Sequence, residues 1–289
     1  MVNPRVLITA GICLCAAFGY SLQLGQKAAD DLTAGQQLPE EPEAPLELEN
    51  ITLTSASPDL PKAENAQGSA EPSCLFSVSS AAGAGAMVHL DVSAPCEPHA
   101  RVSIHHSGML FSARLNNAGT LSMEVPALKA SGIFIVETEA GQAEVILQPV
   151  TDLDLVERVA LQWRGNSGFE LHAREFGADY GAKGHVWHGS SDGAGRIYQL
   201  GDSDMDTPEL VEIYTLPHNA LTASGDIALT VEAEITALNC DSSISAQVLD
   251  LRAGALTIRD LVLDMPDCDA AGDFLVLNNL VENLTIAQN

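Results

Sequence analysis

Apolar and polar side chains alternate along short runs from Cys74 onward, and this pattern limits the fold more than any other feature of the chain. The clearest run is Leu229–Ala237, in which odd-numbered residues are apolar and even-numbered residues are Thr or Glu. A period of two residues is typical of a β-strand with one buried face, and no long stretch repeats with the 3.6-residue period of a helix. After Cys74 the sequence therefore predicts an all-β protein, with the odd-numbered side chains of this run facing inward.

The predicted strands fall into two groups along the chain. About six or seven short strands fit residues 73–150, which indicates a small immunoglobulin-like β-sandwich that lacks the buried Trp of antibody domains. The strands that follow, in residues 151–289, indicate a larger β-sandwich or jelly-roll-like domain. Between the strands expected at Met109–Leu115 and Leu121–Val125, the residues Asn116–Gly119 tolerate positive φ, so a hairpin is predicted at that point.

Residues 1–25 contain an uncharged run of 19 residues, Val6–Leu24. This is close to the roughly 20 residues that a membrane-spanning helix needs. Arg5 precedes the run and Asp30 follows it, so the positive-inside rule places the N-terminus in the cytoplasm. We expect a signal anchor that crosses the inner membrane once and leaves the β-domains in the periplasm. The alternative is a signal peptide cleaved after Gly19, which would give a secreted or periplasmic protein.

Residues 26–72 have a different composition. Six prolines and a cluster of glutamates between Glu40 and Glu49 dominate this segment. Such a composition buries too little apolar surface to offset the entropy of ordering, so the sequence predicts a disordered, extended, acidic Pro-rich linker.

Charge excludes several classes of partner. Lys and Arg total 13 against 39 Asp and Glu, which gives a formal net charge of -26. Binding to nucleic acid or to an anionic lipid surface needs clustered cations, so neither is expected. Nucleotide binding is not expected either, because Gly177–Gly184 lacks the spacing of a phosphate-binding loop and has no hydroxyl residue after Lys183.

The six cysteines support the division into parts. Two lie in the membrane segment, and the others fall two to each β-domain. Beyond an inside-to-outside anchor the compartment is oxidising, so disulfides are expected. Four cysteines allow three pairings, and the local one, Cys74 with Cys96 and Cys240 with Cys268, closes loops of 22 and 28 residues. A four-cysteine metal site is disfavoured because no C-x-x-C spacing occurs.

No catalytic residue emerges from the motifs. Gly189–Gly193 matches G-x-S-x-G, but a strand-like segment rather than a helix follows it, so a plain glycine-rich loop is favoured. His185 and His188 stand three residues apart, which places them on opposite faces of a strand and argues against a shared metal. The adjacent pair His105 and His106 meets the same objection.

A cluster of carboxylates is the best candidate for a metal site. Asp202, Asp204, Asp206 and Glu209 lie close together, and calcium prefers carboxylate oxygens on a tight loop. The spacing departs from an EF-hand, since Thr207 occupies the position of the turn glycine. An exposed acidic loop without metal is the alternative, and no other cofactor is expected.

Aromatic residues gather in one part of the second domain. Trp163, Tyr180, Trp187 and Tyr198 lie within about 40 residues of one another, beside glycine-rich loops. Aromatic rings can stack against a sugar or a peptide, so these four residues form a candidate ligand face, with burial in the core as the alternative.

Several segments resemble a known group of proteins. The stretches Val159–Trp163, Phe169–Ala178, Gly184–Trp187 and Cys74–Pro126 are similar to those of uncharacterised alphaproteobacterial envelope proteins, some of which carry the label "translocase". The resemblance implies a membrane-linked role in transport. It supplies no catalytic residues, and one spanning segment without a phosphate-binding loop does not make an energised pore.

Together these features predict a non-catalytic, single-pass envelope protein whose outward-facing β-domains bind a partner or ligand. The partner is an envelope protein or a glycan, and an accessory role in a translocation or secretion assembly is the narrower form of this prediction. The alternatives are a hydrolase that acts on an envelope polymer and a calcium-dependent surface-binding module.

Overall fold

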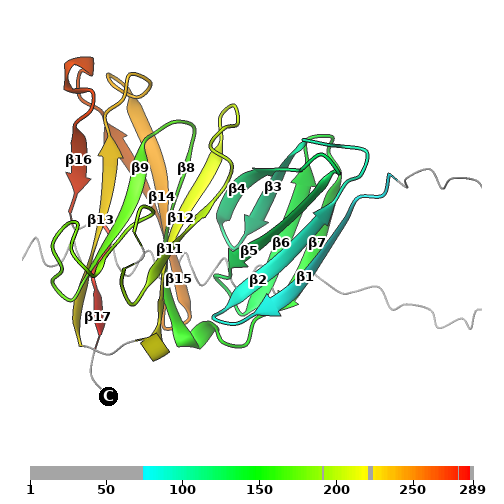
Figure 1. Ribbon diagram of the computed structural model, residues 1–289, viewed down its shortest axis with the longest axis horizontal. Coiled ribbons are helices and arrows are strands. Elements are labelled where there is room, and N and C mark those ends of the chain that lie inside the picture. The colour runs from blue at the N-terminus through cyan, green and yellow to red at the C-terminus, as the bar shows by residue number, and fades with distance from the viewer. Residues whose placement is uncertain (1–73, 191, 221–223, 279, 287–289) are drawn as a thin grey trace, which may run out of the picture. The chain divides into compact units, whose positions relative to one another are not determined.

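A computed structural model describes residues 74–190, 192–220, 224–278 and 280–286. They form seventeen strands and three short 3-10 turns, and all strand pairings within the sheets of this part are antiparallel (Figure 1). The all-β prediction is therefore confirmed. The predicted membrane segment, the linker and Cys13 and Cys15 lie outside the described residues, and within these residues no helix is long and apolar enough to cross a membrane.

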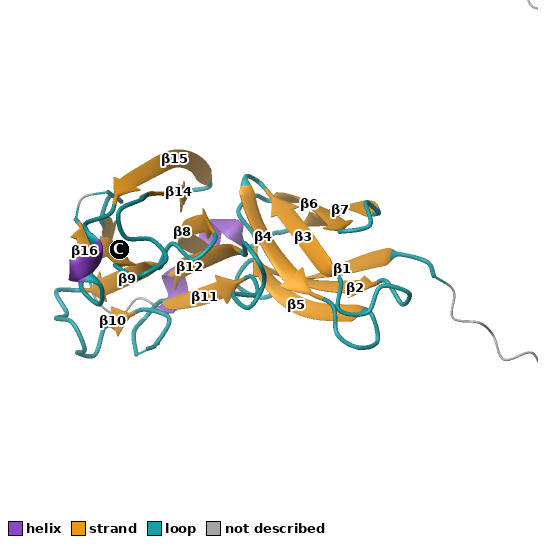
Figure 2. Cartoon of the chain, turned by 90° about the horizontal axis from the view of Figure 1, so that it is seen from above, coloured by secondary structure: helices purple, strands orange, loops and turns teal. Residues whose placement is uncertain are grey.

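Seven strands form the first set, which has two sheets in the orders β1-β2-β5 and β4-β3-β6-β7. The two sheets lie in separate layers (Figure 2). Alternate side chains of each strand point between the layers, and the largest buried ones include Leu90, Ile104, Phe111 and Phe134. The strands are β1 Ser77–Gly83, β2 Met87–Ser93, β3 Arg101–His106, β4 Met109–Arg114, β5 Thr120–Pro126, β6 Ser131–Thr138 and β7 Ala143–Pro149.

The turn at Asn116–Gly119 exists, but the hairpin predicted there is wrong. Gly119 has a φ of 70°, and the side chain of Asn116 accepts hydrogen bonds from the backbone of Ala118 and Thr120. However, β4 pairs with β3 and β5 pairs with β2, so the chain changes sheets at this turn. Alternation shows which residues of a strand face inward, but it does not show which strand lies beside it.

Ten strands form the second set, again with two sheets, in the orders β11-β12-β8-β14-β15 and β10-β9-β13-β16, where β17 also pairs with β13. They are β8 Val156–Arg164, β9 Phe169–Glu175, β10 His185–Val186, β11 Arg196–Leu200, β12 Glu209–Pro217, β13 Gly225–Glu234, β14 Ser243–Arg252, β15 Ala255–Asp264, β16 Phe274–Leu277 and β17 Leu284–Ile286. The 3-10 turns are Leu153–Leu155, His218–Ala220 and Cys268–Ala270.

The central strands β12, β8 and β14 of the sheet β11-β12-β8-β14-β15 contribute to cores on both faces. In β8, Val159 and Leu161 belong to the core of the second set, whereas Val156 and Ala160 belong to a cluster that includes the core of the first set. This cluster also contains Ile213 from β12. Residues of opposite parity therefore face two different cores, which explains why Val159, Ala160 and Leu161 are apolar in succession rather than alternating with polar residues.

Arg158 links the two sets of strands. Its side chain is fully buried and donates hydrogen bonds to the carbonyls of Gly85, Ala86 and Ala127 in the first set and to the hydroxyl of Thr215 in the second. Desolvation by burial lowers the pKa of Arg158 to about 10. The guanidinium is thus charged at neutral pH, and backbone carbonyls rather than a carboxylate compensate for its burial.

Both predicted disulfides are present. Cys74 pairs with Cys96 and Cys240 pairs with Cys268, with Cα–Cα distances of 5.1 and 5.0 Å. Two disulfides of this kind indicate an oxidising, extracytoplasmic environment. Each could add about 3 kcal/mol by restricting the unfolded chain.

The run Leu229–Ala237 follows the prediction only in part. Leu229 and its odd-numbered neighbours up to Ile235 are buried, but the strand ends at Glu234 and Ala237 is exposed. The strand ends there because the side-chain amide of Asn239 donates to the carbonyl of Glu234 and turns the chain. Glu232, predicted to face solvent, is also buried, because a loop covers that side of the sheet.

Candidate functional site

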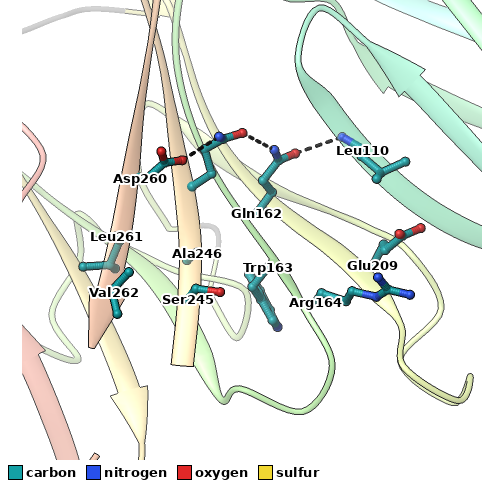
Figure 3. Close-up of a pocket in the computed structure, with 11 residues that line it drawn as sticks. Leu110, Gln162, Trp163, Arg164, Glu209, Ser245, Ala246, Asp260, Leu261 and Val262 are labelled. Carbon is teal, nitrogen blue, oxygen red and sulfur yellow. Dashed lines mark hydrogen bonds between the residues drawn. The ribbon is translucent and has the colours of Figure 1, made fainter. Parts of the chain in front are cut away.

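A groove of about 510 Å³ lies at one end of the sheet that contains β8, β14 and β15. Residues of β12 and β4 complete its walls (Figure 3). Its volume falls within the range of roughly 300–1,000 Å³ that small-molecule sites occupy. The register explains its position, since the pairing of β8 with β14 ends at Trp163 and Ala246 while β14 continues beside β15 to Ser243.

A row of hydrogen-bonded side chains crosses the groove. Gln162, Gln247 and Asp260 stand opposite one another on three adjacent strands. The amide of Gln247 donates to Asp260 at 2.8 Å, and the amide of Gln162 donates to Gln247 at 2.7 Å (Figure 3). At the far end, the backbone N–H of Leu110 in β4 donates to Gln162 at 2.9 Å, and Gln162 donates to the carbonyl of Gly108 at 2.9 Å. The row thus belongs both to the groove and to the contact between the two sets of strands.

A second row on the same face is open to solvent. Arg164, Ser245 and Val262 are exposed, and Val262 has 69 % of its surface accessible. Trp163 also lines the groove, but its half-buried indole points to the opposite face of the sheet, where it packs against the core of the second set and lies 6.2 Å from the ring of Phe169. The open face of the groove therefore offers an aliphatic side chain and several polar groups.

The four aromatic residues of the predicted ligand face are not brought together. Trp163 lines the groove, and Tyr198 lines a separate hollow of about 240 Å³ beside Gly195. Tyr180 and Trp187 instead pack around two histidines on the outer side of β9, 4.9 and 6.2 Å from the ring of His185. Only Trp163 of the four lies in the groove.

The predicted calcium ligands are paired with arginines of the first set of strands. Asp202 forms a salt bridge with Arg114 at 3.1 Å, and Glu209 forms one with Arg101 at 3.2 Å. The other oxygen of Asp202 accepts the backbone N–H of Asp204 at 3.0 Å. Within the described residues no group of three or more His, Cys, Asp or Glu is arranged to hold a metal. Calcium binding at this loop stays a prediction, and the arginines compete for two of the four carboxylates.

A histidine cluster, formed by Glu170, His172, Tyr180, His185 and Glu232, covers the outer face of β9 and β13. The sequence patterns did not reveal this cluster, because its members come from the three strands β9, β10 and β13 and a loop. The nitrogen Nδ1 of His172 lies 2.9 Å from Nε2 of His185, and its Nε2 lies 3.2 Å from Glu170 and 3.7 Å from Glu232. Tyr180 donates its hydroxyl to Glu232 at 2.5 Å. The alternation of Glu170, His172 and Arg174 along β9 was the only sequence signal.

The backbone fixes the protons of this cluster. The N–H of Gly181 donates to Nδ1 of His185 at 2.9 Å, so that nitrogen carries no proton. A neutral His185 is therefore protonated on Nε2 and donates to His172, which in turn donates from its own Nε2 to Glu170. A histidine that donates from Nε2 cannot bind a metal through that atom. Burial lowers the pKa of His185, and His172 adds to this effect.

Glu212 joins the two sheets of the second set near this cluster. Its carboxylate is buried and accepts hydrogen bonds from the backbone N–H of Leu171 at 2.7 Å and from Gln199 at 2.9 Å. His188 lies 3.5 Å from Glu212 and 4.0 Å from Glu170. Burial raises the pKa of Glu212, whereas the hydrogen bond from His172 lowers the pKa of Glu170. His185 and His188 thus have different partners.

The glycine-rich segment around the G-x-S-x-G match has a structural role in the residues described. Ser191 lies outside these residues, but the N–H groups of Ala194 and Gly195 donate to the buried carboxylate of Glu175 at 2.6 and 2.7 Å. The hydroxyl of Tyr214 donates to the same carboxylate at 2.7 Å. A Cβ on Gly195 would lie 2.5 Å from the Tyr214 ring, so glycine is required there.

Comparison with known proteins gives no further assignment. No protein-family model matches the chain, and no curated protein is similar to it. The resemblance to envelope proteins stays a prediction.

Proposed function

We propose that this chain is a non-catalytic, single-pass envelope protein whose β-sandwiches bind a partner or ligand in the groove beside Trp163. Two disulfides support an extracytoplasmic location for the β-rich part. The uncharged Val6–Leu24 run supports an anchor in the inner membrane. An accessory role in a translocation or secretion assembly is the narrower form of this proposal.

The groove is the observation that carries the proposal. It combines an exposed valine with a row of polar side chains contributed by neighbouring strands. Side chains on paired strands are held more firmly than side chains on loops, so the site is organised before a ligand arrives. Preorganisation of this kind favours recognition, and it demands no reactive group.

We also propose finer assignments for the two sandwiches. The sheet orders β1-β2-β5 and β4-β3-β6-β7 support an immunoglobulin-like topology for the first. For the second, two sequential hairpins, β11–β12 and β14–β15, lie within one sheet. This arrangement favours a β-sandwich over a jelly roll, whose two Greek keys send successive strands to opposite sheets.

Site-specific photocrosslinking in intact membranes tests the proposed function. A photoreactive residue replaces Val262 in the groove and, as a matched control, Val145 on β7, since the two side chains are 69 % and 66 % exposed. We expect a discrete adduct from position 262 and none from position 145. Equal labelling at both positions, or no adduct at 262, would refute binding in the groove.

A hydrolase is the second candidate, because Glu170 and Glu212 flank His188 and have pKa values shifted in opposite directions. Such a pair can divide the roles of acid and base. The bonds of Glu212 to Leu171 and Gln199 favour a structural role instead. Release of soluble fragments from purified cell-wall polymer, abolished by Glu170→Gln, would support hydrolysis, and absence of release would eliminate it.

A further inference from the structure

We propose that the free edge of β15 binds an extended, basic peptide segment of a partner protein, which adds a further strand to the sheet beside the groove. This inference rests on the proposed function and names the class of partner. It follows from the unpaired backbone groups of β15, from the hollows on its two faces and from the charges along it.

Among the described residues, β15 is the longest strand at the edge of a sheet. It pairs with β14 over all ten residues of Ala255–Asp264, and no other described strand pairs with it. The other edge strands of this part of the chain have at most seven residues. Figure 2 shows β15 at the outer border of its sheet. A long edge without a bulge or a proline is open to pairing with a further strand, and natural proteins usually shorten, cover or interrupt such edges.

The hairpin that joins β14 to β15 shows which backbone groups point outward. Its two loop residues, Ala253 and Gly254, have φ values of 47° and 76°, as in a type I′ turn. The residues that flank such a turn, here Arg252 and Ala255, exchange both of their hydrogen bonds. Every second residue from Ala255 therefore bonds to β14, and the even-numbered residues of 256–264 direct their N–H and C=O groups away from it. No described group bonds to these outward groups.

A hollow borders β15 on each face of the sheet. The groove lies on the face that carries Asp260 and Val262. A second hollow, of about 350 Å³, is lined by Thr257 and Arg259, whose side chains point to the opposite face. The side chains of an added strand alternate between the two faces, so successive residues would enter different hollows. Recognition by strand addition combines main-chain hydrogen bonds at an edge with pockets for alternate side chains, and β15 offers both.

The charges on the groove side of β15 favour a basic peptide. Among the described residues, the carboxylate of Asp260 accepts a hydrogen bond from Gln247 alone. Its neighbours on the same face are Ile258 and Val262, which are 45 % and 69 % exposed. A Lys or Arg opposite Asp260 on the added strand would form a cross-strand ion pair between two apolar contacts. The net charge of the chain is -26, and its field attracts a cationic segment.

Two other occupants fit this edge less well. A second copy would pair β15 with itself about a twofold axis perpendicular to the sheet, which brings residues of equal parity opposite each other. The two registers that use most of the strand are centred on Arg259 or Asp260 and place that residue opposite its own copy, so like charges meet. The predicted linker of this chain, residues 26–72, is rich in glutamate and therefore has the wrong charge.

Defined peptides test the inference on the full-length protein. The probe is a fluorescein-labelled, C-terminally amidated peptide, Thr-Val-Thr-Lys-Thr-Val-Thr, whose Lys can lie opposite Asp260 while its Val residues lie opposite Ile258 and Val262. Fluorescence anisotropy measures its binding. We expect saturable binding, about fivefold weaker binding of a control peptide with Glu in place of Lys, and the reverse preference in Asp260→Lys. Absence of binding, or equal affinities of the two peptides for both proteins, would overturn the inference.

N-methylated peptides separate pairing at the edge from contact with side chains alone. In antiparallel addition, the peptide residues opposite Ile258, Asp260 and Val262 direct their own N–H groups to β15. A peptide methylated on both Val nitrogens should therefore not bind. The matched control is methylated on the two Thr nitrogens beside Lys, which point to solvent, and it should bind. Equal binding of the two methylated peptides, or equal loss of binding, would refute strand addition.

Photocrosslinking at a second position distinguishes this inference from the proposed function. Arg259 is exposed and points to the face opposite the groove, so an added strand passes both 259 and 262, whereas a ligand confined to the groove reaches only 262. We expect photoreactive residues at both positions to label the same basic segment of one protein. Adducts at 262 alone would leave the proposed function standing and refute strand addition. A crosslinked dimer of this chain would overturn the choice of partner, and labelling at neither position would overturn both proposals.

Discussion

Replacing Arg158 tests how strongly the two sets of strands depend on each other. The Arg158→Met variant keeps most of the apolar stem but removes the donors to the carbonyls of Gly85, Ala86 and Ala127. Ala127 is fully buried, so water does not easily replace the donor to its carbonyl, whereas the carbonyl of Ala86 keeps the backbone N–H of Ala127. A hydrogen bond from a charged donor contributes about 1.5–3 kcal/mol.

The cost of burying the charged guanidinium must be subtracted from this loss of hydrogen bonds. Burial lowers the pKa of Arg158 from 12.5 to about 10, so the charged guanidinium is disfavoured in the folded protein by about 3 kcal/mol. Methionine removes this cost. Three lost acceptor bonds outweigh it, and we expect a net loss of about 2–4 kcal/mol in the free energy of unfolding, a large part of the roughly 5–15 kcal/mol typical of a folded protein.

Urea denaturation followed by tryptophan fluorescence and far-UV circular dichroism measures the effect. In Arg158→Met we expect a lower midpoint and separate transitions for the two probes, because both tryptophans belong to the second set of strands. The matched control is Arg259→Met, whose side chain is 45 % exposed and which should change stability by less than about 0.5 kcal/mol. An unchanged or raised midpoint for Arg158→Met would show that the buried charge is a net burden and would refute the reasoning.

Three further predictions concern single side chains. Burial lowers the pKa of His106 from 6.5 to about 4, so between these pH values the unfolded chain binds one proton more than the folded chain. About 3 kcal/mol of the free energy of unfolding should therefore be lost as the pH falls from 6.5 to 4. Unfolding curves recorded across this pH range measure the loss. Gly195→Ala places a Cβ against the ring of Tyr214, and we expect a lower melting temperature. Gln162→Met removes the acceptor of the Leu110 N–H, so hydrogen exchange at that amide should accelerate.

Each of these predictions has a contrary outcome. The pH dependence of stability should flatten in His106→Gln, and an unchanged slope would assign the acid effect to other groups. Gly83→Ala is the control for the glycine variant, since a Cβ there meets only ordinary contacts at 3.4 Å or more, and equal melting temperatures for both would contradict the steric argument. Gln142→Met is the control for Gln162→Met, because Gln142 is exposed. Equal exchange at the Leu110 amide in both variants would contradict the assigned contact.

Local features of the fold could be predicted from the sequence. Alternation along Leu229–Ala237 indicated a strand, and the spacing of Cys74 and Cys96 indicated a local disulfide because both depend on nearby residues. The absence of a helix after Gly193 correctly favoured a glycine-rich loop. Each of these features can be predicted without knowing which strands pair with each other in the sheets.

Features that depend on long-range register could not be predicted. Gln162, Gln247 and Asp260 form one row only because β8, β14 and β15 pair in a particular register, and none of the three residues carries a motif. Arg158 looked like an ordinary polar residue at the start of a strand, although its side chain reaches carbonyls more than thirty positions away in the chain. Aromatic residues close in sequence were expected to form one face. However, Trp163 lies at the end of β8, whereas Trp187 lies in a loop beside the histidine cluster.

The position of the groove follows from the central strands that contribute to cores on both faces of the sheet. Because β8 and β14 contribute to two cores, their ends meet solvent only where the first set of strands stops covering them, and the row from Asp260 to Leu110 lies at that boundary. Gln162 donates its two amide hydrogens to Gly108 and Gln247, and its amide oxygen accepts the Leu110 N–H. These bonds hold β4 against the sheet and fix the orientation of Gln247 in the groove. Any movement between the two sets of strands must therefore break this row before it changes the shape of the site. The contact that joins the sandwiches and the polar surface offered to a ligand are the same set of hydrogen bonds, so we expect the groove to be rigid although it lies at a junction.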